Sequence, residues 1–178
     1  INLLGVKEVS IDEYLNSQFD YPVFLNIDVM DYNERIDGQL SNFNDFINHL
    51  ADYKSSFMKY AKHTDIFIAG HYYGAGAPYL FTRNDVRESD FKICVVADVS
   101  CDIDGPVATT IRPSKINSPI YGYNPITESE DDFLNDDCIA VMAVDNLPCE
   151  LPKDSSEDFG ENLINFVIPI ISNNNNNI

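Results

Sequence analysis

The sequence predicts an α/β domain built on a parallel sheet. Residues 65–69, 92–98 and 138–145 are nearly continuous apolar runs, and polar residues follow each of them. Strands that are buried on both faces of a parallel sheet have this composition. Between residues 42 and 62 the apolar positions recur with helical spacing instead, so we expect one or two helices there, broken near Asp52.

Composition and charge limit the classes of partner. The chain has 178 residues, 44% of them hydrophobic and 22% charged, which is typical of one soluble globular domain. Its formal net charge of −18 repels phosphate backbones and anionic lipid, so we expect neither a nucleic-acid nor a membrane partner. We find no apolar run long enough to cross a bilayer and no secretory signal, and we expect a cytoplasmic protein.

The segments before the first apolar run carry weaker signals. Glycine at position 5 is typical of a helix C-cap, and we interpret the first five residues as the last turn of a helix. The further elements expected here are strands at 6–10 and 23–29, a short helix at 11–18 and a polar turn at 33–38.

Proline-rich residues 105–137 have little periodicity, and we expect an irregular excursion with a short hairpin around residues 120–123. Further on, Asp154 and Glu157 have the spacing of a capping box and predict the start of a helix. One face of this helix would be apolar, with Phe159, Leu163, Phe166, Val167 and Ile170. Asparagines 173–177 form a low-complexity tail to which we assign no function.

The four cysteines lack the spacing of zinc ligands. Three of them lie in apolar runs, and we interpret the cysteines as reduced core residues. We therefore expect no metal site built on cysteine.

Three strand ends carry the candidate functional residues, because ligands of open α/β sheets bind outside the carboxyl ends of the strands. The first is Gly70 with His71, the second is residues 98–105 (DVSCDIDG), and the third begins with Asn146 and Leu147. His71 could be a general acid or base, or a structural histidine. Asn146 could bind a carboxamide or start a turn.

The acidic strand end has three interpretations. If residues 98–104 stayed extended, Asp98, Asp102 and Asp104 would share one face. Such a cluster would need a divalent cation, or it would place one carboxylate against a substrate amine or imine. The structural alternative is a polar strand exit with a turn before Gly105, and spacing alone favours that alternative. The sequence contains no GxGxxG, so phosphate binding by a glycine-rich turn cannot be inferred from it.

Residues 98–105, the Thr109-Thr110-Ile111 segment that follows and residues 143–152 (AVDNLPCELP) resemble the alanine dehydrogenase family. Within that family the likeness is greater to the lysine-forming saccharopine dehydrogenases and the lysine–oxoglutarate reductases. The resemblance implies a Rossmann-like parallel sheet, truncated at its first strand and glycine turn. It also implies a partial NAD(P)-binding domain at 1–149, a closing segment and helix at 150–172 that returns to an absent substrate domain, and a tail at 173–178.

The resemblance also implies roles for single residues. Asp102 matches the catalytic aspartate beside the nicotinamide and the substrate. The residues implied to border the cofactor are Gly70, His71, Asp98, Asn146 and Leu147. The bound cofactor would be NAD or NADP, because both Ser10 and Asp12 are candidates for the ribose-binding position.

The implied reaction is hydride transfer at the amine or imine carbon of an amino acid or imino acid. The family's catalytic Lys and His belong to the substrate domain, so we expect this chain alone to be inactive. Two rival functions stay open: a metal-dependent phosphotransferase or hydrolase that uses the three aspartates, and a non-catalytic nucleotide- or protein-binding module. The identity of the substrate and a homo-oligomeric state are also left open.

Overall fold

The computed structural model describes residues 4–71 and 73–174. It divides into two compact units, residues 1–145 and residues 146–178, and each is described here by itself. In the described part of the chain, no helix is both long enough and apolar enough to span a membrane.

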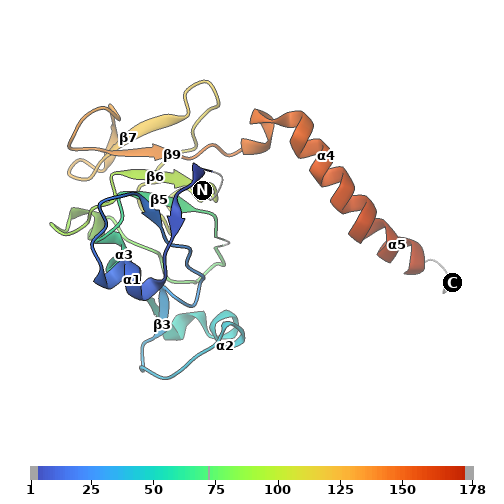
Figure 1. Cartoon of the computed structure of the whole chain (residues 1–178), viewed down its shortest axis with the longest axis horizontal. Coiled ribbons are helices and arrows are strands. Elements are labelled where there is room, and N and C mark those ends of the chain that lie inside the picture. The colour runs from blue at the N-terminus through green and yellow to red at the C-terminus, as the bar shows by residue number, and fades with distance from the viewer. Residues whose placement is uncertain (1–3, 72, 175–178) are drawn as a thin grey trace. The chain divides into compact units, whose positions relative to one another are not determined.

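The first unit is organised around a five-stranded mixed sheet (Figure 1). Its strands follow the order β5 (Ile66–Ala69), β6 (Val95–Asp98), β9 (Ile139–Met142), β7 (Ile120–Asn124) and β8 (Ser129–Asp131). The first three are parallel, which confirms the three predicted strands. Strands β7 and β8 form the expected hairpin, but β7 pairs antiparallel with β9, so the prediction of a wholly parallel sheet is wrong.

The parallel strands bury one face only. Ala69, Val96 and Val141 lie in the core and are at most 1% exposed. On the opposite face Ile66 is 62% exposed and Ile68 50% exposed. Neighbouring side chains along a strand point to opposite faces, so burial alternates with period two. The prediction that these runs are buried on both faces is therefore wrong for the described unit.

Before the sheet, β1 (Lys7–Glu8) pairs in parallel with β2 (Val23–Phe24). Helix α1 (Ile11–Asn16) joins them, and Ser10 and Glu13 form a capping box at its start. Both predicted strands are thus present but short. Gly5 has a φ of +73°, as a C-cap glycine would, while residues 1–3 of the predicted helical turn lie outside the described residues.

The next segment differs from the prediction. It contains β3 (Asn33–Arg35), α2 (Phe43–Asn48), a 3-10 turn at Leu50–Asp52, β4 (Tyr53–Ser55) and α3 (Met58–Ala61). Helices α2 and α3 confirm the two helices predicted with a break near Asp52. Strands β3 and β4 are antiparallel partners that we did not predict, because we expected only a polar turn at 33–38 and a break between the helices.

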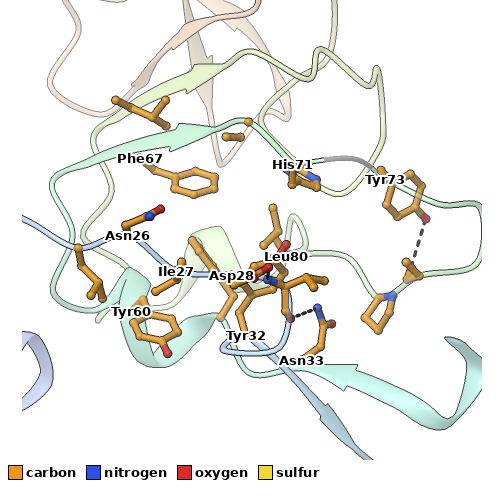
Figure 2. Close-up of a pocket in the computed structure, with 18 of the residues that line it drawn as sticks. Asn26, Ile27, Asp28, Tyr32, Asn33, Tyr60, Phe67, His71, Tyr73 and Leu80 are labelled. Atoms are coloured by element: carbon orange, nitrogen blue, oxygen red, sulfur yellow. Dashed lines mark hydrogen bonds between the residues drawn. The ribbon is translucent and has the colours of Figure 1, made fainter. Parts of the chain in front are cut away.

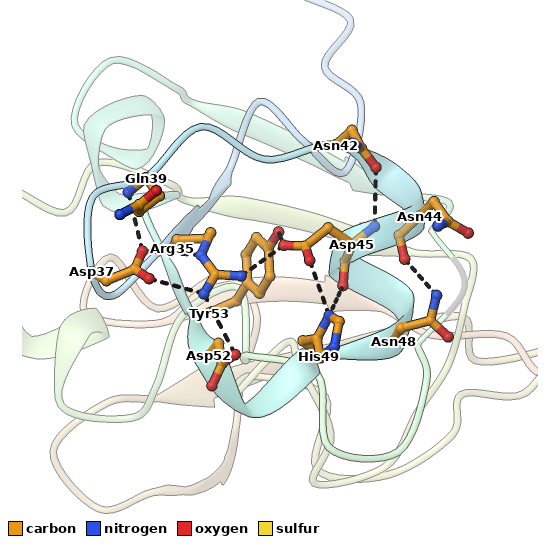
Figure 3. Close-up of polar contacts among 10 residues, drawn as sticks. All are labelled: Arg35, Asp37, Gln39, Asn42, Asn44, Asp45, Asn48, His49, Asp52 and Tyr53. Carbon is orange, nitrogen blue, oxygen red and sulfur yellow. Dashed lines mark hydrogen bonds and ion pairs between the residues drawn. The ribbon is translucent and has the colours of Figure 1, made fainter.

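A polar network around Arg35 explains the strand pair (Figure 3). The Arg35 guanidinium donates to Asp45 of α2 at 2.7 Å and to Asp37 at 2.9 Å. Tyr53 of β4 donates its hydroxyl to the same Asp45 carboxylate at 2.7 Å. The Arg35 contact lowers the pKa of Asp37 to about 2. These polar contacts link β3, α2 and β4. The spacing of apolar residues cannot predict them.

The second unit is helical. It contains a 3-10 turn at Leu147–Glu150, α4 (Pro152–Asn162), a π-helical segment at Leu163–Val167 and α5 (Ile168–Asn174). The predicted capping box is wrong, because α4 begins at Pro152 and has no side-chain cap. Proline is favoured in a first helical turn. Because α4 begins at Pro152, Asp154 lies inside the helix and does not cap it. Residues 175–178 of the predicted tail lie outside the described residues.

The apolar side chains predicted for one face of this helix lie at the surface of the chain: Phe159, Leu163, Phe166, Val167 and Ile170. The cysteines also depart in part from the prediction. All four are free thiols, but only Cys138 is buried, while Cys94 and Cys149 are exposed.

Candidate functional site

The candidate residues of the first unit meet at the carboxyl ends of β5 and β6. Ala69, the last residue of β5, pairs with Asp98, the last residue of β6. His71 lies in the loop after β5, and Asp102 lies in the loop after β6. The negative charges of Asp98 and Asp102 both act on the His71 imidazole, as expected for neighbours.

Asp98 is a buried anchor for its own loop. The residue is 1% exposed. Its carboxylate accepts hydrogen bonds from Ser100 Oγ at 2.6 Å, Cys101 N at 3.0 Å and Thr110 Oγ1 at 2.6 Å. Both carboxylate oxygens are therefore engaged by the chain itself. In the sequence, Thr110 stands out only as part of the Thr109-Thr110-Ile111 segment. Its hydrogen-bond partner Asp98 lies 12 positions away along the chain.

The loop after Asp98 is sharply bent. Cys101 has a φ of 54° and Asp104 a φ of 51°, values that non-glycine residues adopt at a cost. The Gly105 N–H donates to the carbonyl of Asp102 at 3.0 Å and closes a turn. The condition for a shared face, an extended backbone from 98 to 104, is therefore not met, and the backbone agrees with the alternative that spacing favoured, a strand exit with a turn before Gly105.

The three aspartates consequently have different environments. Asp98 is engaged as described, and Asp104 pairs with Arg83 at 2.7 Å. Asp102 is half-buried, and the hydrogen bonds and ion pairs among the described residues leave its carboxylate unused. Nor do the described residues include any group of three His, Cys, Asp or Glu side chains placed to hold a metal ion. The shared-face geometry that the metal interpretation required is absent from this loop.

A cavity of about 1020 Å³ opens beside β5 (Figure 2). Its walls come from β5 and the loop after it, including Gly70, His71 and Tyr73, and from residues 23–33 on the other side. Figure 2 shows Phe67 and His71 facing the segment that carries Asn26 and Ile27. The lining is largely apolar and aromatic, and the described residues in it include no Lys or Arg.

His71 lines this cavity, but its Nε2 is not exposed to it. Its Nε2 is buried without a hydrogen-bond partner among the described residues. Burial lowers the pKa of His71, and the carboxylates of Asp98 and Asp102 oppose that effect. Burial therefore favours the neutral form of this imidazole. A buried ring nitrogen without a partner carries a desolvation cost that the hydrogen bonds among the described residues do not offset.

Tyr121 of β7 is a structural support that the sequence did not reveal. Its hydroxyl donates to the Thr109 carbonyl at 2.9 Å and accepts from the Ile111 N–H at 3.1 Å. Burial raises the pKa of Tyr121 to about 12. The hairpin thus holds the segment that brings Thr110 to Asp98.

The remaining candidates are Gly70, Asn146 and Leu147. Asn146 and Leu147 belong to the second unit, where Asn146 precedes a 3-10 turn. Gly70 lies at the cavity wall but is exposed, and a Cβ atom there would meet nothing within 4 Å. Their predicted contacts with a cofactor stay predictions.

The fold and the site define an α/β domain whose polar residues gather at the carboxyl ends of parallel strands, the usual ligand position in such domains. Comparison with known proteins makes this specific. The model of the family described as alanine dehydrogenase/PNT, C-terminal domain, matches residues 25–178. The chain belongs to this family, whose C-terminal domain is Rossmann-like.

Curated relatives point to one branch of the family. The chain is 30% identical over 127 residues to alpha-aminoadipic semialdehyde synthase of Arabidopsis thaliana, covering 69% of this chain and 12% of the relative. It is 32% identical over 107 residues to saccharopine dehydrogenase [NAD(+), L-lysine-forming] of Schizosaccharomyces pombe, covering 57% and 26%. The mouse mitochondrial alpha-aminoadipic semialdehyde synthase is 26% identical over 124 residues, covering 60% and 13%. The chain thus spans between about an eighth and a quarter of these relatives.

Proposed function

We propose that this chain is the nucleotide-binding part of an NAD(P)-dependent amino-acid dehydrogenase and that Asp102 is its catalytic residue. The observation that carries the proposal is the difference among the three aspartates. Asp98 and Asp104 are engaged by the chain, whereas Asp102 keeps its carboxylate available at a strand end beside His71. A half-buried carboxylate of this kind is suited to a cationic ligand group.

The proposed reaction is reversible hydride transfer at a carbon that bears an amine or imine. When bound, the nicotinamide supplies or accepts the hydride, and the protein orients the reactants. The carboxylate of Asp102 would stabilise the positive charge of the amine or iminium nitrogen. This substrate class agrees with the names of the relatives, one of which is a saccharopine dehydrogenase that uses NAD(+).

The cavity supports a nicotinamide ligand at its His71 end. If the imidazole turned its buried, unpartnered Nε2 toward the cavity, that nitrogen could accept from or donate to a carboxamide or a ribose hydroxyl. The apolar and aromatic lining suits the uncharged parts of such a cofactor. Because the described lining offers no cationic side chain, we assign the phosphates to groups outside this cavity.

Binding of NADH and NADPH tests the cofactor half of this proposal. The binding can be followed through the fluorescence emission of the reduced nicotinamide. We expect this emission to change saturably when NADH or NADPH is titrated with a polypeptide that contains this chain. His71→Ala should weaken binding by about tenfold, the loss expected for one buried hydrogen bond. His49→Ala is the matched control, because His49 is exposed and does not line the cavity. Absence of saturable binding of either dinucleotide would refute the cofactor assignment.

A further inference from the structure

Arg83 connects the loop that carries Asp102 with the turn between β7 and β8. Three non-glycine residues of the described chain have a positive φ: Cys101, Asp104 and Glu128. The Arg83 guanidinium pairs with two of them, with Asp104 through Nη2 at 2.7 Å and with Glu128 through Nη1 at 3.0 Å. Glu128 lies in the turn between β7 and β8, far from Asp104 in sequence.

This network continues from the loop into the hairpin. Arg87 also pairs with the Glu128 carboxylate and donates from Nε to the Pro125 carbonyl at 2.9 Å. The ion pairs among the described residues include none between Arg87 and Asp104. The two arginines therefore share Glu128 but not Asp104. Among the described residues, only Arg83 forms ion pairs with both the hairpin and Asp104, the residue that precedes Gly105.

The backbone between Asp102 and Gly105 leaves little freedom for independent movement. The Asp104 N–H donates to the Thr110 carbonyl and the Gly105 N–H to the Asp102 carbonyl, both at 3.0 Å. A shift of Asp104 therefore changes the turn that closes on Asp102. Because a left-handed residue persists only where its surroundings fix it, the partner of the Asp104 carboxylate matters for this turn.

We infer that Arg83 is a positioning residue, which orients Asp102 by holding Asp104 against the β7–β8 hairpin. The inference rests on the proposed role of Asp102. Arg83 and Asp104 are partly exposed, at 41% and 64% for their side chains, so the pair contributes little to global stability. Its effect is expected in the order of the loop and in the placement of the carboxylate.

Amide hydrogen exchange tests the inference without requiring activity. In Arg83→Ala we expect the Asp104 and Gly105 amides to exchange about fivefold faster, the change that an exposed ion pair of about 1 kcal/mol produces. Core amides of β6 and β9 should stay within twofold of the wild type. Arg83→Lys should restore most of the protection, because an ammonium can keep one contact with Asp104.

Arg87→Ala is the matched control. It removes the same charge and the same Glu128 partner but leaves the Asp104 pair in place, so we expect unchanged exchange at Asp104 and Gly105. Equal acceleration in both variants would overturn the inference, as would exchange within twofold of the wild type in Arg83→Ala.

Turnover in a polypeptide that contains this chain gives the functional readout. Arg83→Ala should lower kcat by roughly tenfold and leave the KM for the dinucleotide unchanged, since small displacements of a catalytic group have effects of this size. An unchanged kcat in Arg83→Ala, together with a strong loss in Asp102→Asn, would overturn the inference and leave the proposed function standing. Full turnover in Asp102→Asn would refute the proposed function, while the exchange data would still decide whether Arg83 orders the loop.

Discussion

Gly105→Ala is predicted to damage the site through a single added methyl group. A Cβ atom at Gly105 would lie 2.7 Å from the Asp102 Cβ and 2.8 Å from the Asp102 carbonyl oxygen. Gly105 does not have a positive φ, so the substitution introduces no backbone strain of that kind. Ordinary contact begins at 3.4 Å. Relief therefore requires Asp102 to move by about 0.7 Å, which at a catalytic residue costs on the order of 10- to 100-fold in rate.

Gly122→Ala separates this local effect from overpacking in general. A Cβ atom there would lie 2.7 Å from the Asp132 carbonyl, in the β7–β8 hairpin. Both variants should lower the free energy of unfolding by about 1–3 kcal/mol, as overpacking does. Urea unfolding measures that cost, and steady-state kinetics should show the large fall in kcat for Gly105→Ala alone. Equal rates for the two variants, after allowance for the folded fraction, would refute the reasoning.

Three further predictions concern stability. Asp98→Ala leaves the buried Thr110 hydroxyl and the Cys101 N–H without their acceptor, and urea unfolding should show a loss of about 2–5 kcal/mol; an unchanged midpoint would contradict the anchoring role. Tyr121→Phe should cost about 1–2 kcal/mol near neutral pH. Because the pKa of folded Tyr121 is raised to about 12, its protonated form contributes stability that is present below pH 10 and lost as the pH rises through 12, and the Phe variant should lack this alkaline loss in thermal melts. Burial lowers the pKa of His71 below 6.5, so the unfolded chain binds a proton more readily than the folded chain. The free energy of unfolding should therefore fall as the pH drops below 6.5, and His71→Gln should reduce this dependence on pH.

Hydrophobic pattern predicted the parallel part of the sheet well. Strands β5, β6 and β9 were evident because apolar runs of that length, bounded by polar residues, have few alternatives. The pattern could not predict that β7 would join the same sheet, because strand pairing between distant segments is not written in local sequence. It also missed β3 and β4, whose polar side chains Arg35 and Tyr53 both bond to Asp45 of α2.

The candidate site was located by its strand ends, but its internal roles were not readable from spacing. Even spacing of Asp98, Asp102 and Asp104 suggested a shared face, and only the backbone at Cys101 and Asp104 shows that the chain turns. The partners that distinguish the aspartates are distant: Arg83 lies 21 positions from Asp104. Such contacts form between residues that only the folded chain brings together, so their pairing cannot be predicted from the spacing of residues in one sequence.

Asp102→Asn in a polypeptide that contains this chain is the most direct test of the proposed function. Asp145→Asn, the same chemical change at an exposed position after β9, is the matched control. We predict that Asp102→Asn lowers the rate of hydride transfer by about 100-fold or more, the scale found when a charge-stabilising group is removed, and leaves the dinucleotide Kd unchanged. Turnover of Asp102→Asn within a few-fold of both the wild type and Asp145→Asn would contradict the assignment of Asp102 as the catalytic residue.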